Sequence, residues 1–165
     1  MFICGLLCPL LAPRALAVDS APVITPVRNT AVGYALTMDR VTSSFEGKCV
    51  NAGGAKAARA RAAWKARNGE LVDSADRYLR IVRNLIKQSH GEEAARRFYE
   101  EQKAAFAKHA ELTVWDSMLS GSGRAEVCGR MLGAIAEGRM DFSATPEHFR
   151  TLKEISEEVA RAGVK

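Results

Sequence analysis

The sequence lacks the patterns that mark most enzymes and cofactor-binding proteins. No two of its three histidines have the i, i+4 spacing of a helical metal site; they are His90, His109 and His148. It has no C-x-x-C-H segment, which excludes covalently bound c-type haem. The Gly-Ser-Gly at 121–123 lacks the Lys and Ser/Thr that complete a phosphate-binding loop. No nucleophile or orienting carboxylate stands at a recognisable spacing from His109. We therefore expect no catalytic, metal or cofactor site, and a protein that is not an enzyme.

The sequence also lacks an apolar run of membrane-spanning length. Its most apolar run covers about residues 1–12, whereas a spanning helix needs about twenty residues. A short apolar run followed by the small-x-small tripeptide Ala15-Leu16-Ala17 is typical of a secretory signal peptide. We expect residues 1–17 to be removed by cleavage after Ala17, and the mature protein to be periplasmic or secreted. One alternative is that this segment is not cleaved and serves as a membrane anchor. A second is that translation begins at an earlier start codon, because no Lys or Arg precedes the apolar run, as a signal peptide normally requires.

Cysteine is scarce, and cleavage makes it scarcer. Cys4 and Cys8 lie in the expected signal peptide, so that only Cys49 and Cys128 remain. An even cysteine count in an oxidising compartment predicts one disulfide between these two residues. Such a bond closes a loop of about 80 residues, for which the chain-entropy model gives an upper value of about 4–4.5 kcal/mol. The alternative is a pair of free, buried thiols.

Charge of either sign is not in large excess. The whole chain carries a formal charge of +5, and loss of Arg14 with the signal peptide leaves a mild excess that gives little steering toward anionic partners. We therefore expect no nucleic-acid partner. The basic residues do gather in one run, which predicts either a solvated helix face or a weak contact with an anionic membrane surface. The residues that would make this membrane contact are Lys56, Arg59, Arg61 and Lys65.

Helical periodicity dominates after residue 29. Residues 18–29 contain two prolines and no helical period, and predict an extended N-terminal arm. Apolar residues at steps of three and four then predict successive helices, with Gly-rich breaks between them. Their expected ranges are 30–49, 55–89, 92–119 and 124–138, followed by a helix capped by Thr145 with Pro146 in its first position. We predict an all-α fold, an antiparallel bundle of four to five helices over residues 30–165. In an up-down bundle the two cysteines reach the same pole, in agreement with a disulfide.

Polar residues interrupt two of the apolar stripes. Asn68 lies in the stripe of the second helix, and Gln102 and His109 lie in that of the third. If all three point inward, they form a polar layer that fixes helix register, or they line a pocket for a small ligand. Asn68-Gly69 is in addition a turn signal within the second helix, which leaves a kink or break there as an alternative.

The stretch Trp64 to Asn68 brings an indole, a guanidinium and an amide within about one and a half helical turns. Trp64 and Asn68 share a helix face, and Arg67 beside them is suited to stacking or to binding an anion. The simpler interpretation is a tryptophan anchored in the core with a solvated arginine next to it.

One arrangement of residues extends over about residues 30–142. It consists of Cys49, the W-x-x-R-N stretch that begins at Trp64, and Cys128 followed by Gly138 and Asp141. In this arrangement the chain resembles a group of uncharacterised secreted bacterial proteins. The resemblance implies an exported protein and no particular activity. Our functional hypothesis is an exported binding protein whose partner is another protein of the cell envelope, in the role of an inhibitor, an immunity-type protein or an accessory factor. The alternative is a small-ligand or cofactor-binding bundle that uses the internal polar layer.

Overall fold

The computed structural model describes residues 23–120 and 123–162, and most of these residues are helical. The elements are α1 (Pro26–Gly53), α2 (Ala55–His90), α3 (Glu92–Leu119), α4 (Arg124–Ala136), the short 3-10 helix η1 (Phe142–Ala144) and α5 (Pro146–Arg161). The predicted all-α fold class is confirmed. The expected signal peptide, residues 1–17, lies outside the described residues. Among the helices described, none is both long and apolar enough to span a bilayer.

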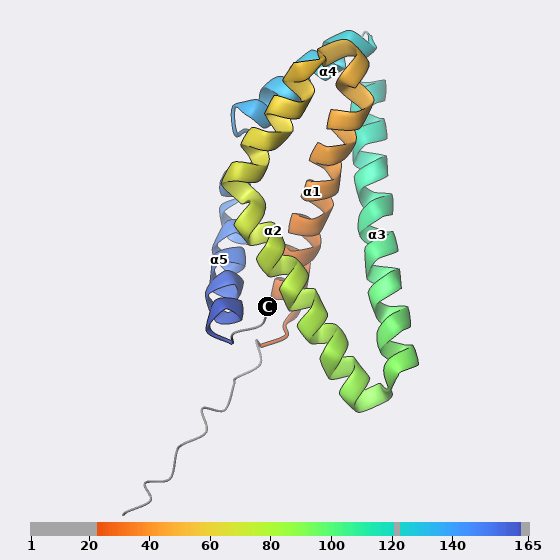
Figure 1. Cartoon of the computed structure of the whole chain (residues 1–165), viewed down its shortest axis with the longest axis vertical. Helices are drawn as coiled ribbons and strands as arrows, with labels where there is room; N and C mark the ends of the chain where they lie inside the picture. Colours follow the sequence, from red (N-terminus) through yellow and green to blue (C-terminus); the bar gives the residue numbers. More distant parts are fainter. Residues whose placement is uncertain (1–22, 121–122, 163–165) are drawn as a thin grey trace, which may run out of the picture.

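The long helices α1 and α2 form the centre of the bundle. α1 rises through the molecule, α2 returns beside it, and α3 rises again on one side (Figure 1). α4 lies across the upper end and contacts α1 and α2, and α5 descends against these two helices on the side away from α3 (Figure 1). The expected antiparallel arrangement is present, with α4 and α5 together taking the place of a fourth long helix.

The N-terminal arm is shorter than predicted, because α1 begins at Pro26 rather than at residue 30. Thr25 has an extended backbone, and its Oγ1 accepts a hydrogen bond from the Arg28 backbone N–H at 3.2 Å. This is an N-cap followed by a proline in the first helical turn, where a missing N–H costs nothing. Of the expected arm at 18–29, residues 26–29 are therefore helical, and 18–22 lie outside the described part of the chain.

The turn signal Asn68-Gly69 does not break α2, which is helical from Ala55 to His90. Asn68 turns its amide back along the helix, and its Nδ2 donates to the Trp64 carbonyl at 3.0 Å. The side chain is also held by long-range contacts described below, and tertiary packing of this kind overrides a weak local preference. The helix ends instead at Gly91, whose φ of 86° is readily reached by glycine.

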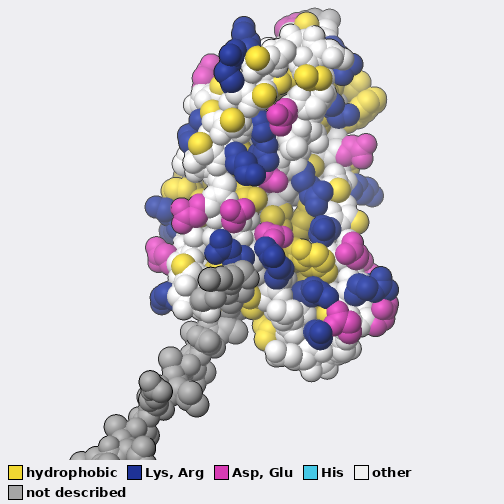
Figure 2. Space-filling model, in the orientation of Figure 1, with side chains coloured by type: hydrophobic (Ala, Val, Ile, Leu, Met, Phe, Trp, Pro, Cys, Tyr) yellow, Lys and Arg dark blue, Asp and Glu magenta, His cyan; other side chains and the backbone are white. Residues whose placement is uncertain are grey.

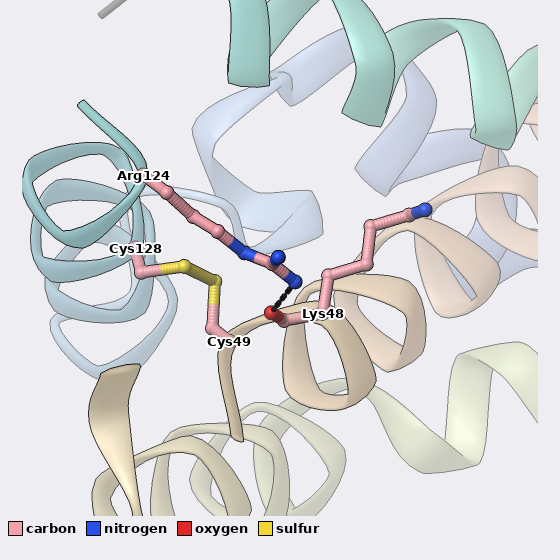
Figure 3. Close-up of a disulfide and its surroundings, with 4 residues drawn as sticks. All are labelled: Lys48, Cys49, Arg124 and Cys128. Carbon is pink, nitrogen blue, oxygen red and sulfur yellow. Dashed lines mark hydrogen bonds between the residues drawn. A yellow bond between two sulfur atoms is a disulfide. The ribbon is translucent and has the colours of Figure 1, made fainter. Parts of the chain in front are cut away.

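The predicted disulfide is present. The sulfur atoms of Cys49 and Cys128 are 2.02 Å apart and the Cα atoms 5.4 Å apart. The bond joins the last turns of α1 to the first turns of α4 at one pole of the bundle (Figures 1 and 3). Beside it, the Arg124 guanidinium donates a hydrogen bond of 2.8 Å to the Lys48 carbonyl (Figure 3).

The apolar stripes are buried as predicted on α1, α2, α4 and α5, but α3 is rotated relative to our expectation. Its C-terminal half buries Phe106, Ala110 and Val114, whereas the predicted stripe there ran through His109. His109 is exposed, and Leu112 has 48% of its surface exposed.

Candidate functional site

Trp64 anchors α2 to the segment that links α4 and α5. It is fully buried, and its indole N–H donates a hydrogen bond of 3.0 Å to the Met140 carbonyl. The Phe142 ring meets the indole edge-on with 5.5 Å between centroids. The Arg61 guanidinium carbon lies 5.0 Å from the indole centroid, within cation–π range. The prediction of an anchoring tryptophan agrees with these contacts.

Arg67 and Asn68 bind the same carboxylate, that of Asp141. Arg67 Nε donates to Asp141 Oδ2 at 2.5 Å, and Asn68 Nδ2 donates to Asp141 Oδ1 at 2.9 Å. Asn68 Oδ1 accepts a hydrogen bond from the Phe142 backbone N–H at 3.0 Å, and Arg67 also donates to the Ile135 carbonyl at 2.7 Å. The anion that Arg67 is suited to bind is therefore supplied by the chain itself. We refer to Trp64, Arg67, Asn68 and Asp141 as the clamp.

Gly138 makes the clamp sterically feasible. α4 ends at Ala136, two residues before the predicted end, and Gly138 turns the chain with a φ of 80°. A Cβ atom at this position would stand 2.9 Å from Asp141 Oδ2. Both the backbone conformation and the close approach of the carboxylate favour glycine here. The polar groups of Arg67, Asn68 and Asp141 are thus paired with one another and with the backbone of the same chain.

The expected polar layer of Asn68, Gln102 and His109 is not formed. Asn68 is 3% exposed and faces Asp141, whereas His109 points outward from α3 and Gln102 is half-buried. The prediction was wrong because the stripe through Gln102 and His109 lies about 90° around α3 from the buried stripe at Phe106, Ala110 and Val114. In the described residues no group of three His, Cys, Asp or Glu side chains is placed to hold a metal ion.

The basic run on α2 does not form one continuous surface. Lys56, Arg59 and Lys65 are exposed, but Arg61 turns inward. Its guanidinium pairs with the Asp39 carboxylate on α1 and donates to Thr42 Oγ1 at 2.8 Å. Arg61 therefore holds α1 against α2 and is not available to a membrane surface.

An apolar stripe on α3 is exposed to solvent. Leu112, Trp115 and Leu119 have 48%, 59% and 66% of their surface exposed. Their spacing of three and four residues aligns them along one face of the helix, and we call them the α3 ridge. Figure 2 shows hydrophobic side chains along the outer edge of the upper part of α3.

The α3 ridge does not belong to the bundle core. At about 100° per residue, its centre lies about 170° around the helix from the centre of the buried stripe at Phe106, Ala110 and Val114. A rotation of α3 that buried the ridge would expose the core stripe. The ridge is thus additional apolar surface on the side of α3 that faces away from α1 and α2.

Two small clefts flank Trp115, and each has two cationic side chains in a lining that is otherwise mixed. One is bounded by Lys48, Met118 and Arg124, and the other by Lys48, Lys108, Glu111 and Leu112. The Lys48 side chain comes from the end of α1 and extends away from the disulfide (Figure 3). The disulfide pole thus places cationic side chains from α1, α3 and α4 around one exposed indole.

A wider groove lies between α1, α2 and α3. It has a volume of about 740 Å³ and is lined by apolar residues such as Leu36, Val72 and Phe106, together with charged residues of both signs. Figure 2 shows hydrophobic side chains between α2 and α3, with charged side chains around them. Asn68, Gln102 and His109 are not among the residues that line it.

The ends of α1 and α5 are joined by an ion pair. Arg28 donates to both carboxylate oxygens of Glu158, at 2.5 and 2.6 Å. The hydrogen bond from Arg28 lowers the pKa of Glu158 below its ordinary value. Nearby, burial raises the pKa of Tyr78, whose hydroxyl donates to Asn29 Oδ1 at 3.1 Å.

Comparison with protein-family models, with curated proteins and with solved structures finds no match for this chain. The functional proposal therefore starts from the fold and the surface features of the described residues: a disulfide-bonded helical bundle with an exposed apolar ridge on α3.

Proposed function

We propose that this chain is an exported binding protein of the cell envelope, and that it contacts a partner protein through the α3 ridge. The observation that carries this proposal is the exposure of Leu112, Trp115 and Leu119 on the helix face opposite the core. Aligned, exposed, large apolar side chains on one helix are characteristic of interaction sites. Tryptophan is also the residue type most enriched among those that dominate binding energy.

Two features support an extracytoplasmic location. A disulfide such as Cys49–Cys128 persists in oxidising compartments, and residues 1–17 have the pattern of a secretory signal peptide. The protein recovered from the exported fraction should begin at Val18. Intact mass measurement of that fraction checks this, and a mass corresponding to the full chain would contradict the cleavage.

Site-specific photo-cross-linking in the cell that makes the protein tests the ridge. A photoreactive amino acid in place of Trp115 should give one discrete adduct, because position 115 lies at the centre of the contact. The same amino acid in place of Glu157, which is exposed on α5, is the matched control and should give none. A double Leu112→Ser, Leu119→Ser variant should lose the adduct at position 115. Equal adducts at both positions, or none at 115, would contradict the proposal.

A second candidate function is binding of a small molecule in the groove between α1, α2 and α3. Its volume of about 740 Å³ lies in the range of small-molecule sites. Native mass spectrometry of the exported protein tests this candidate. A bound mass that disappears when Ala107, an exposed residue of the groove lining, is replaced by Trp would support it, and a ligand-free spectrum would exclude it for the isolated protein.

A further inference from the structure

The α3 ridge carries information about the chemistry of its partner. Trp115 projects between two clefts whose walls bear the side chains of Lys48, Lys108 and Arg124, against one carboxylate, that of Glu111. Lys108 is on the axis of the ridge itself, four residues before Leu112. Lys48 and Arg124 are contributed by α1 and α4, and both lie next to the disulfide (Figure 3).

The disulfide fixes this arrangement. It joins the residue after Lys48 to the first turns of α4, which begins at Arg124. The hydrogen bond of 2.8 Å from Arg124 Nη2 to the Lys48 carbonyl adds a second link between the same two segments. The Arg124 guanidinium and the backbone that carries Lys48 are therefore held in place at this pole, and less conformational freedom of these two segments is lost when a partner binds.

We propose that the partner is an acidic protein surface: an apolar groove that receives the α3 ridge, with carboxylates that enter the two clefts beside Trp115. This inference rests on the proposed function and specifies its partner. Carboxylates of the partner opposite Lys48, Lys108 and Arg124 make the two surfaces electrostatically complementary. The apolar groove of the partner covers Leu112, Trp115 and Leu119. An anionic lipid bilayer fits less well, because its evenly distributed head groups would face Glu111 and Asp116, which flank the ridge on both sides of α3, as well as the cations. A protein surface can place its carboxylates opposite Lys48, Lys108 and Arg124 alone.

Charge reversal in the cross-linking experiment tests the inference. With the photoreactive amino acid at position 115, Lys108→Glu and a double Lys48→Glu, Arg124→Glu variant should each lower the adduct yield by about tenfold or more, because like charges then oppose each other. Arg150→Glu is the matched control; Arg150 is exposed on α5, away from the ridge, and its reversal should leave the yield unchanged. Mapping of the adduct identifies the partner peptide, and an Asp or Glu to Lys change there should restore cross-linking to Lys108→Glu.

The outcomes separate this inference from the proposed function. If the adduct yield is the same in Lys108→Glu and in the double Lys48→Glu, Arg124→Glu variant as in the unreversed protein, the partner surface is not acidic. The ridge would then remain a contact surface for a partner of other chemistry. Absence of the adduct in the unreversed protein overturns both. Sedimentation of the purified protein with vesicles of phosphatidylglycerol and phosphatidylethanolamine, together with a blue shift of Trp115 fluorescence, would assign the ridge to a membrane and overturn the acidic protein partner.

Discussion

Replacement of Asp141 by Ala should remove the centre of the clamp and destabilise the protein by about 2–3 kcal/mol. Asp141 is 7% exposed and accepts hydrogen bonds from Arg67 and Asn68. Loss of one partner from a buried ion pair costs about 3–5 kcal/mol. The cost here is lower for two reasons: the Arg67 side chain is 37% exposed and can be rehydrated, and Asn68 Nδ2 keeps its hydrogen bond to the Trp64 carbonyl.

Urea unfolding followed by circular dichroism measures this loss as a lower midpoint with an unchanged slope. Glu137→Ala is the matched control, because Glu137 forms an exposed ion pair with Arg139 only a few residues away. It should change stability by less than about 0.5 kcal/mol. A double-mutant cycle between Arg67→Ala and Asp141→Ala should give a coupling of about 1–2 kcal/mol. A loss below about 0.5 kcal/mol for Asp141→Ala, or a coupling of zero, would refute the structural role that we assign to the clamp.

Four further changes test other parts of the structure by the same unfolding assay. Replacement of both disulfide cysteines by Ala should cost about 2–4 kcal/mol, and equal midpoints with and without reductant for the unmodified protein would argue against the bond. Gly138→Ala should cost about 1–3 kcal/mol, because its φ of 80° is strained for alanine and the new Cβ meets the Asp141 carboxylate. Glu158→Gln should lower stability by up to about 1 kcal/mol at neutral pH. Since Arg28 lowers the folded-state pKa of Glu158, this difference exists above the unfolded pKa of about 4.3 and should vanish as pH falls through the folded value; a difference that persists at low pH would contradict the ion pair. Trp115→Ser should leave stability within about 0.5 kcal/mol, because the side chain is largely exposed; a large loss would place Trp115 in the core.

Features that depend on nearby residues were predictable from the sequence. The breaks around Gly54 and Gly91, and the start of α5 at Pro146, follow from local conformational preferences. The disulfide was also predictable, because the expected cleavage leaves only two cysteines and an up-down bundle brings them to one pole. The start of α1 was misplaced by four residues, since Thr25 and Thr30 both resemble an N-cap and only Thr25 makes the hydrogen bond.

The contacts of the clamp were not predictable from spacing. Asp141 lies 73 residues after Asn68, in a segment whose path depends on how α4 leaves the bundle. The stretch from Trp64 to Asn68 shows that a polar side chain lies next to a buried helix face. It does not show whether a ligand or the chain itself will form hydrogen bonds with that side chain. Burial requires a partner for Asn68, and tertiary structure supplies Asp141.

The error on α3 has a physical cause that bears on function. The sequence of this helix carries two apolar faces, one ending in Phe106, Ala110 and Val114 and the other in Leu112, Trp115 and Leu119. Periodicity identifies apolar residues but not which face α1 and α2 will cover, and the stripe expected through His109 fell between the two. A helix that only completes a bundle needs one apolar face. The second face on α3 leaves about half or more of the surface of Leu112, Trp115 and Leu119 exposed to solvent, and this is the surface that the proposed partner would cover.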